Sequence, residues 1–376
     1  MHRISYVAVM FAAVLFGTAS IPVAASASTT IDVEGGSLGA LVSPDGEQLY
    51  VPADVHDANN QSIQGHVAFI DTETNTVTSR VPVGVLPTRP VSDPSGGRLY
   101  VPNNSSGTIT VINAKEASVT ATINVGGNPT YATFLPGLSR LLVTSGSSGE
   151  LVAVDTRSNT VSHRVKLGGY VWGLSLTSDS RFALVTNIEL NRLDVIDTRT
   201  LNVVAQVPTG IEPTRPILTP NGRLALISNY GESSVTVVDT RSFQVVRTIA
   251  VGNAPTPPVI SPSGRWAWIT NADDDTVMRI DLTKVRGTSN PVSRTVGAGD
   301  EPWALLLNAS GSTLYVANRM SAGLTVICSK AGTPTRTLGT TNPNRWLTAG
   351  PAIYTGGMGA VIDVISAAPL KRDRCR

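Results

Sequence analysis

The sequence predicts an all-β protein in which four-stranded antiparallel sheets are repeated around a closed ring. Three observations support this prediction: a repeat of 42 residues, four short β-rich segments within each repeat, and almost no sustained helical periodicity. A repeat of this length is a supersecondary unit that buries its apolar face by stacking against copies of itself. The chain also contains 34 Gly and 24 Pro among its 376 residues, which disfavours long helices.

A polar turn built around Gly or Ser marks each repeat and precedes a strand of the Leu-Tyr-Val type. Successive turns are separated by 50, 42, 42, 42, 42 and 47 residues, so the period is 42 with two insertions. The seven turns are Pro44-Asp45-Gly46, Pro94-Ser95-Gly96, Pro136-Gly137, Ser178-Asp179-Ser180, Pro220-Asn221-Gly222, Pro262-Ser263-Gly264 and Ala309-Ser310-Gly311.

The repeat that begins at Pro213 shows the expected strands. Residues 214–219 and 224–228 are short apolar segments, residues 235–238 alternate in polarity, and residues 245–251 form a fourth β-rich segment. Turn chemistry lies between successive segments. Each repeat is therefore predicted to be an antiparallel meander.

An acidic residue recurs where the third strand of the repeat ends. The short side chain of Asp can accept a hydrogen bond from a backbone N–H two residues further on and so fix a turn. Equivalent positions in stacked repeats lie apart, so these carboxylates are predicted to be structural and not to form a metal or acid–base site. The positions are Asp71, Asp155, Asp197, Asp239, Asp281 and Asp363, with Asn113 and Cys328 as variants.

The two ends of the chain predict ring closure. Seven full repeats run from about residue 37 to residue 338, and a degenerate eighth follows. Residues 30–36 match the fourth strand of a repeat and can complete the last sheet, which leaves few exposed sheet edges. We therefore predict a closed β-propeller of eight blades over residues 28–366. Seven blades is the alternative, in which the segment after Leu338 packs as a cap.

The sequence also resembles the YVTN-repeat β-propellers, a family that includes YncE-like and surface-layer-like proteins. The residues that carry the resemblance are Tyr50-Val51-Pro52, Tyr100-Val101-Pro102-Asn103 and Tyr315-Val316-Ala317-Asn318, and the similarity covers nearly the whole mature chain. It implies the propeller fold. For function it implies either a propeller with no known reaction or, among more distant relatives by fold, an enzyme such as virginiamycin B lyase or a gluconolactonase.

The N-terminal residues 1–27 have the pattern of an export signal. Arg3 supplies a positive start, residues 6–16 are uncharged and mostly apolar, and Ala25-Ser26-Ala27 is a small-residue cleavage site. The apolar run is too short to span a bilayer. The mature protein is therefore expected to be secreted, periplasmic or on the cell surface, with a charged C-terminal tail at residues 367–376.

The net charge of the whole chain is +2, and removal of a signal containing one Arg leaves +1. This balance gives no electrostatic reason to expect nucleic acid or an anionic membrane as a partner. The only two cysteines are Cys328 and Cys375. A disulfide between them is expected in an oxidising compartment, and two unpaired thiols are the alternative.

Candidate binding residues follow from aligning the repeats at the start of each inner strand, around the central channel. Two repeats carry the same tetrapeptide, Pro87-Thr88-Arg89-Pro90 and Pro213-Thr214-Arg215-Pro216. Guanidinium groups near aromatic rings can hold an anionic or carbohydrate-like ligand. Alternatively, these side chains line the channel and pair with acids such as Glu212 and Glu301. The candidate ligand-binding residues are Arg89, Arg215, Tyr131, Trp172, Trp303 and Arg345.

The first repeat has an eight-residue excess between its second and third strands, and this segment contains His56, Asp57 and His66. These side chains can ligate a metal or supply a general base. Their spacing matches no established zinc pattern, so a solvated polar loop is the alternative. Residues 273–275, three consecutive acids, are likewise either an oxygen site for Ca²⁺ or a solvated loop.

Two functions remain open from the sequence, and whether the protein is an enzyme is not decided. The first is a binding protein without a cofactor, whose partner is a small molecule, a glycan or a protein. The second is a metal-assisted lactonase-like or lyase-like enzyme that acts on a small anionic or sugar-like substrate. In that enzyme His56 or His66 is the base, a divalent ion is the electrophile, and Arg89 with Arg215 holds the substrate.

Overall fold

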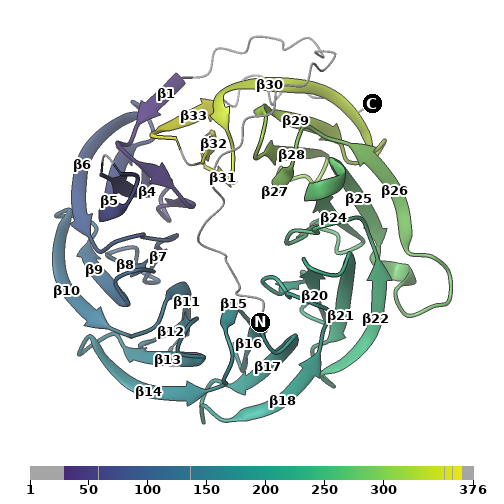
Figure 1. The fold of residues 1–376 in the computed structure, drawn as a ribbon, viewed down its shortest axis with the longest axis horizontal. Coiled ribbons are helices and arrows are strands. Elements are labelled where there is room, and N and C mark those ends of the chain that lie inside the picture. The colour runs from purple at the N-terminus through teal and green to yellow at the C-terminus, as the bar shows by residue number, and fades with distance from the viewer. Residues whose placement is uncertain (1–28, 58, 136, 351, 358, 366–376) are drawn as a thin grey trace.

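The chain forms a closed ring of eight four-stranded antiparallel blades (Figure 1). The computed structural model describes residues 29–57, 59–135, 137–350, 352–357 and 359–365. Within each blade the strands run from the inside of the ring to the outside. The predicted eight-bladed architecture is confirmed. The signal at residues 1–27 and the tail at residues 367–376 lie outside the described residues.

The strands fall into four concentric sets. The inner strands are β3 (Leu41–Val42), β7 (Val91–Ser92), β11 (Pro129–Leu135), β15 (Val171–Leu176), β19 (Ile217–Leu218), β23 (Val259–Ile260), β27 (Pro302–Leu307) and β31 (Trp346–Ala349). The second strands are β4 (Gln48–His56), β8 (Arg98–Asn103), β12 (Arg140–Ser145), β16 (Phe182–Asn187), β20 (Leu224–Asn229), β24 (Trp266–Asn271), β28 (Thr313–Asn318) and β32 (Ile353–Gly356).

The third strands are β5 (Ser62–Asp71), β9 (Thr108–Asn113), β13 (Glu150–Asp155), β17 (Arg192–Asp197), β21 (Ser234–Asp239), β25 (Thr276–Asp281), β29 (Ala322–Cys328) and β33 (Val361–Ile365). The outer strands are β6 (Thr76–Val83), β10 (Ser118–Asn124), β14 (Thr160–Lys166), β18 (Val203–Pro208), β22 (Gln244–Ala250), β26 (Val292–Gly297), β30 (Thr333–Pro343) and β1 (Thr29–Asp32). A short strand β2 (Gly36–Ser37) pairs with β4, and η1 (Ala272–Asp274) and η2 (Leu282–Lys284) are single 3₁₀ turns.

Ring closure depends on β1, the first described strand. It pairs with β33 in antiparallel register, with Thr30 opposite Asp363 and Ile31 opposite Ile362. Ile31 is 4% exposed and belongs to a core cluster with Trp346 and Ile362 of the last blade. The N-terminal strand therefore completes the last sheet, as the sequence predicts.

The hydrophobic core lies between the blades. Among the described residues, buried apolar side chains form eight clusters, one at each interface between neighbouring blades. The second and third strands are buried on both faces, as in Leu224–Asn229, whereas outer strands such as Thr160–Lys166 are mostly exposed. A blade thus obtains its core only from its neighbours, which explains the repetition in the sequence.

The Asn at the end of the second strand packs against a Gly that precedes the next inner strand. The Nδ2 atom of Asn103 donates to Thr110 Oγ1 at 2.9 Å. A Cβ atom at Gly84 would lie 2.7 Å from Cβ of Asn103, so a larger residue does not fit there. The same close approach joins Gly210 to Asn229, Gly252 to Asn271 and Gly299 to Asn318. This contact gives a physical reason for the Tyr-Val-x-Asn and Val-Gly elements of the repeat.

Several inner strands are shorter than predicted, and in three blades proline explains the difference. Where the fourth residue of the inner segment is Pro, the ladder is interrupted, because Pro has no N–H to donate. An isolated bridge and a two-residue strand remain in the blades that contain Pro90, Pro216 and Pro258. The inner strands of the blades with Ala132, Leu174 and Leu305 at this position are continuous.

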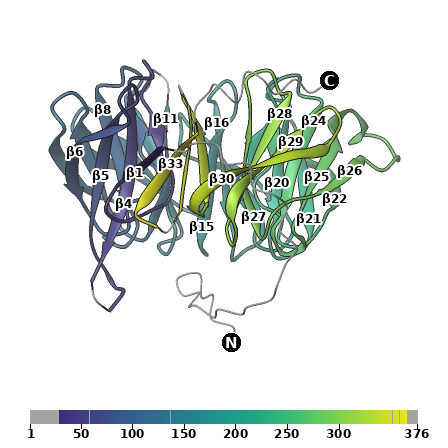
Figure 2. The same ribbon diagram turned by 90° about the horizontal axis from the view of Figure 1, so that it is seen from above.

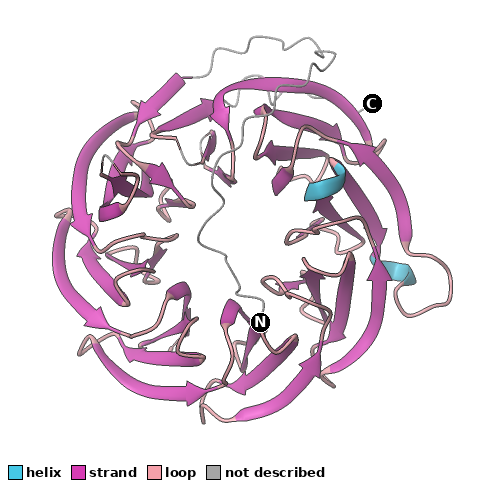
Figure 3. Ribbon diagram, in the orientation of Figure 1, coloured by secondary structure: helices cyan, strands magenta, loops and turns pink. Residues whose placement is uncertain are grey.

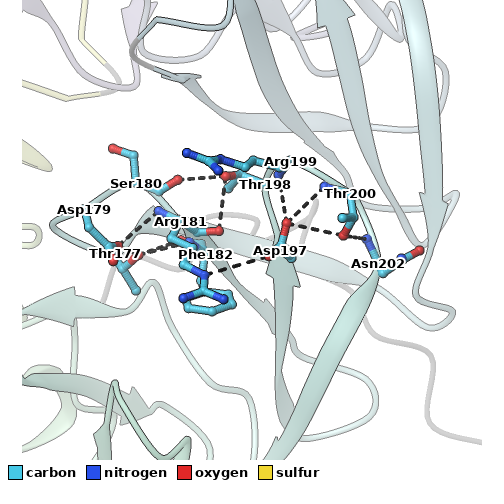
Figure 4. Close-up of polar contacts among 10 residues, drawn as sticks. All are labelled: Thr177, Asp179, Ser180, Arg181, Phe182, Asp197, Thr198, Arg199, Thr200 and Asn202. Atoms are coloured by element: carbon cyan, nitrogen blue, oxygen red, sulfur yellow. Dashed lines mark hydrogen bonds and ion pairs between the residues drawn. The ribbon is translucent and has the colours of Figure 1, made fainter.

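The aspartates at the ends of the third strands fix turns. Oδ1 of Asp197 accepts from the backbone N–H groups of Arg199 and Thr200, both at 3.0 Å (Figure 4). The neighbouring Thr198 hydroxyl donates to the carbonyl of Ser180 at 2.8 Å and so ties this turn to the turn between β15 and β16. Equivalent hydrogen bonds form at Asp71, Asp155, Asp239, Asp281 and Asn113.

Asp363 is an exception, and its predicted turn role is wrong. It lies within β33 and not at the end of that strand, and its side chain is fully buried. Its Oδ1 accepts from the backbone N–H of Thr341 at 2.9 Å and from the Thr341 hydroxyl at 2.8 Å. Asp363 therefore joins the outer strand of the seventh blade to the last blade.

The strand β17 contains two aspartates with opposite pKa shifts. Hydrogen bonds from the Thr200 backbone hold the pKa of Asp197 below its ordinary value, whereas burial raises the pKa of Asp194. A lowered folded pKa stabilises the protein above the unfolded pKa and loses this effect as the pH falls. A raised folded pKa has the opposite sign, so the Asp194 contribution to stability declines as the pH rises through the acid range.

Asp197→Ala is expected to lower the free energy of unfolding at neutral pH by about 1–2 kcal/mol, because turn N–H groups lose their acceptor. The loss should shrink as the pH falls below the ordinary pKa of Asp, about 4, toward the lower pKa of the folded state. Asp194→Asn should change neutral stability by less than about 1 kcal/mol, because loss of the pair with Arg192 offsets removal of a buried charge. Urea titrations at several pH values measure both slopes. Equal pH slopes in the two variants would contradict this assignment.

No helix among the described residues has the length and apolarity needed to cross a membrane.

Candidate functional site

The candidate site lies on the face of the ring that carries two kinds of connection: those between outer and inner strands, and those between second and third strands. The bridge between Pro87 and Asn103 and the hydrogen bond from Asn104 N–H to the carbonyl of Leu86 join the two kinds of connection. Figure 2 shows the ring from the side, with the β4–β5 hairpin projecting beyond the other connections. We call this side the hairpin face.

Arg89 and Arg215 start from equivalent positions and reach back over the preceding blade. Arg89 Nε donates to the carbonyl of Ala40 at 3.0 Å, and Arg215 Nε donates to the carbonyl of Leu174 at 3.3 Å. Glycine makes this path possible. A Cβ atom at Gly39 would lie 3.2 Å from Cβ of Arg89, and one at Gly173 would lie 2.4 Å from Cα of Arg215.

Aromatic rings accompany these arginines. The guanidinium of Arg215 lies 5.7 Å from the ring centre of Tyr131, although the two residues are two blades apart. A contact across an intervening blade requires both side chains to lie near the ring axis. Tyr131 in turn meets Trp172 edge to face at 6.2 Å, and Trp172 lies 6.4 Å from Tyr170. We call Arg89, Tyr131, Trp172 and Arg215 the axial cluster.

The axial cluster is cationic. Among the described residues, no carboxylate lies within ion-pair distance of Arg89 or Arg215. Desolvation by neighbouring protein groups lowers the pKa of Arg89, and the positive charge of Arg215 lowers it further. The Arg89 side chain is nevertheless accessible to solvent. Burial raises the pKa of Tyr131, so its hydroxyl stays protonated and can donate. This arrangement suits an anion.

Trp303 and Arg345 belong to a second group on the same face and not to the axial cluster. Arg319 lies 4.4 Å from the Trp303 ring centre and forms an ion pair with Glu301. Tyr230 meets Trp303 edge to face at 6.0 Å. Burial and the charge of Arg319 lower the pKa of Arg345. The structure thus divides the six predicted binding residues into two sets: four form the axial cluster, and Trp303 and Arg345 lie beside the ion pair of Arg319 with Glu301.

The structure adds Tyr170 to the residues that sequence reasoning selected. It precedes β15 and its ring lies over the connection between β12 and β13, where a Cβ atom at Gly146 would be 2.6 Å away. The repeat alignment considered the residues after the start of each inner strand. Tyr170 lies just before that start, so extending the alignment by one residue identifies it.

The excess segment of the first repeat is a paired hairpin, so its description as a polar loop is wrong. The ladder between β4 and β5 continues to the pair His56 and Ser62. Asp54 accepts from the hydroxyl of Ser62 at 2.5 Å and from the backbone N–H of Leu86 at 3.0 Å. His56 Nε2 lies 3.4 Å from both Asp54 Oδ2 and the Ser62 hydroxyl. The carboxylate of Asp54 and the hydroxyl of Ser62 thus face the same ring nitrogen of His56. A relay through the imidazole needs one group at each ring nitrogen, so this arrangement does not permit it.

His66 is a structural residue in this arrangement. It is 8% exposed, and its Nε2 lies 2.7 Å from the carbonyl of Val33 next to the closing strand. Burial lowers the pKa of His66, so it is neutral and donates this hydrogen bond. It stands opposite Ala53, three positions along β4 from His56, a separation of about 10 Å along the strand. The structure does not bring the two histidines together.

Acidic side chains of the sixth blade also have partners within the protein. Asp274 accepts from the backbone and the side chain of Asn253, both at 2.8 Å, and Asp275 accepts from the backbone of Glu301 at 2.7 Å. Among the described parts of the chain, no three His, Cys, Asp or Glu side chains are arranged to hold a metal ion. Cys328 is buried at the end of β29, and Cys375 lies outside the described residues, so their pairing stays a prediction.

A cavity of ≈ 800 Å³ lies on the opposite face, between the third and fourth blades. Residues of three turns line it, among them Leu138, Arg181 and Asp197. Asp179 accepts from the hydroxyl of Thr177 at 2.6 Å and from the backbone of Arg181 at 3.0 Å. Because these polar groups already serve the turns, the axial cluster is the better candidate for a ligand site.

Known proteins support this description of the fold. Residues 141–261, which run from the third blade into the sixth, match the model of the YNCE-like β-propeller family. The resemblance to YncE-like propellers is confirmed. No curated protein sequence matches the chain significantly.

Solved propellers resemble the chain at the level of the fold. Hydrazine synthase of Kuenenia stuttgartiensis is 20% identical with a TM-score of 0.61, and the match covers 83% of this chain and 99% of that chain. Dihydro-heme d1 dehydrogenase NirN in complex with DHE is 17% identical with a TM-score of 0.68, covering 82% and 67%. The propeller domain of Myceliophteria thermophila Cps50 (Swd1) is 12% identical with a TM-score of 0.56, covering 74% and 95%.

Proposed function

We propose that this YncE-like propeller is an exported binding protein whose ligand is anionic and binds at the axial cluster. The observation that carries the proposal is the pair Arg89 and Arg215, two guanidiniums beside aromatic rings with no carboxylate at ion-pair distance among the described residues. An anion between them replaces mutual repulsion by attraction. The signal pattern of residues 1–27 supports export.

Binding is favoured over catalysis by what the cluster contains. Its side chains offer hydrogen-bond donors, positive charge and aromatic faces, and none of them is a general base at neutral pH. His56 and His66, the candidate bases, belong to the β4–β5 hairpin and have partners within the protein. No specific observation favours the metal-assisted lactonase or lyase, so a ligand-binding role is the function that we propose.

The test is the affinity of the double variant Arg89→Gln/Arg215→Gln for three anions: phosphate, citrate and 2-naphthoate. We expect calorimetry to detect at least one of them with the unaltered protein. The double variant should bind it at least about tenfold more weakly, because each lost charged hydrogen bond is worth more than about 1.4 kcal/mol.

A matched control removes two arginines from the opposite face, Arg181→Gln/Arg199→Gln. This variant should retain the affinity of the unaltered protein. A thermal-shift series with each anion provides a second measurement, because a ligand that binds only the folded protein raises its apparent stability. Equal affinities in the two double variants, or no binding of any of the three anions, would overturn the proposal.

A further inference from the structure

The aromatic side chains beside the axial arginines form a continuous row. It begins at Tyr131, next to the guanidinium of Arg215, and continues through Trp172 to Tyr170. The planes of Trp172 and Tyr170 are inclined by 34°, so these two neighbouring rings are tilted and not perpendicular to each other. All three side chains are half-buried. The row therefore leads from a cationic end to an aromatic end.

Two glycines leave room for the Tyr170 ring and for Arg215, because a glycine has no side chain to occupy the space beneath them. Gly146 lies under the ring of Tyr170, where a Cβ atom would be 2.6 Å from the ring. Gly173 lies under Arg215. The hydroxyl of Thr144 donates to the carbonyl of Trp172 at 2.9 Å and anchors its backbone to the third blade. Three neighbouring blades thus fix the positions of the rings.

Trp172 differs from Trp303, which occupies the same position in the seventh blade. The face of Trp303 is covered by the guanidinium of Arg319 at 4.4 Å, and that cation is paired with Glu301. Trp172 makes a T-shaped contact with Tyr131 and a tilted contact with Tyr170, and no cation covers it among the described residues. Trp172 is therefore half-buried without a cation over its ring, whereas a paired guanidinium lies over Trp303.

We infer that the ligand is an aryl carboxylate, with its carboxylate at Arg89 and Arg215 and its ring against Trp172 and Tyr170. The inference rests on the proposed anion site and adds the chemical class of the ligand. Stacked or edge-to-face aromatic contacts favour a planar ring beyond its buried area. The guanidinium groups favour a carboxylate, which they can bind through two parallel hydrogen bonds.

The experiment compares three probes of similar size by calorimetry. They are 2-naphthoate, the saturated decahydro-2-naphthoate, and the neutral 2-naphthamide. The unaltered protein should bind 2-naphthoate at least about tenfold more tightly than either of the other two. Trp172→Leu should bring the affinities for 2-naphthoate and its saturated analogue close together, while the preference over 2-naphthamide remains.

Trp303→Leu is the control, because it removes the equivalent indole whose face is already covered. It should leave all three affinities and their ratios unchanged. If the saturated acid binds as tightly as 2-naphthoate, and binding still depends on Arg89 and Arg215, the aryl assignment fails and the anion site stands. If Trp303→Leu erases the aryl preference, the ring lies elsewhere and the inference is wrong. If neither acid depends on the two arginines, both proposals fail.

Discussion

Ile31→Asp is expected to lower the free energy of unfolding by about 3–5 kcal/mol, because it places an unpaired charge in the core that closes the ring. Ile31 stands opposite Ile362 and packs with Trp346 at the interface of the last blade with the first. An ionised carboxylate at this site has no cation in the cluster to pair with. Guanidinium chloride titration measures the loss, and hydrogen exchange of β33 amides reports whether β1 has left the sheet.

Thr30→Asp is the matched control in the same strand. Thr30 is exposed and lies on the other face of the strand from Ile31, so the same acid should cost only about 1 kcal/mol, through repulsion with Asp363 directly opposite. Protection of the β33 amides should also be retained. A comparable loss of stability in both variants would show that charge in the strand, and not burial at the closure, is responsible.

Gly173→Ala is expected to weaken anion binding and to destabilise the fold at once. The added methyl group would lie 2.4 Å from Cα of Arg215 and 2.7 Å from the hydroxyl oxygen of Thr186. The first of these is a backbone atom and cannot rotate away, so the segment that carries Arg215 must move. We expect a loss of about 2 kcal/mol in stability, the range of overpacked cores, and about a tenfold loss of affinity for the anion.

Gly297→Ala serves as the control, since a methyl group at Gly297 meets nothing within 4 Å. This change should be neutral or slightly stabilising, because Ala lowers the conformational entropy of the unfolded chain. Affinity for the anion should not change. If Gly173→Ala binds the anion as tightly as the unaltered protein, the position of Arg215 does not matter for binding, and the axial site is wrongly placed.

The blades were predictable because their signals are local and repeated. Turn residues such as Pro220-Asn221-Gly222 and the alternation in residues 235–238 report strands directly, and repetition averages out local ambiguity. The closing strand was also predictable, since residues 30–36 have the pattern of an outer strand. The short inner strands were not, because the effect of Pro216 depends on whether its missing N–H faces a partner.

The repeat alignment selected most residues of the candidate site, but it did not show how they are grouped. Alignment placed Arg89 and Arg215 at equivalent positions, but their shared surroundings depend on glycines in other blades, at Gly39 and Gly173. Nothing in the local sequence of Trp303 shows that Arg319 covers its ring. Hairpin pairing of His56 was missed because the polar residues of this insertion read as a loop, although strand pairing continues through them.

The pairing of β1 with β33 sets an order of events during folding. Strands early in the chain can meet their partners within a repeat, but β1 has its partner more than three hundred residues away and must wait for it. Until the last three strands have formed, residues 29–32 leave an unfinished sheet edge at one end of a growing arc. Completion of the circle is then the step with the greatest loop-closure entropy, and it is the step at which a stalled chain would be caught by chaperones or by another copy of itself.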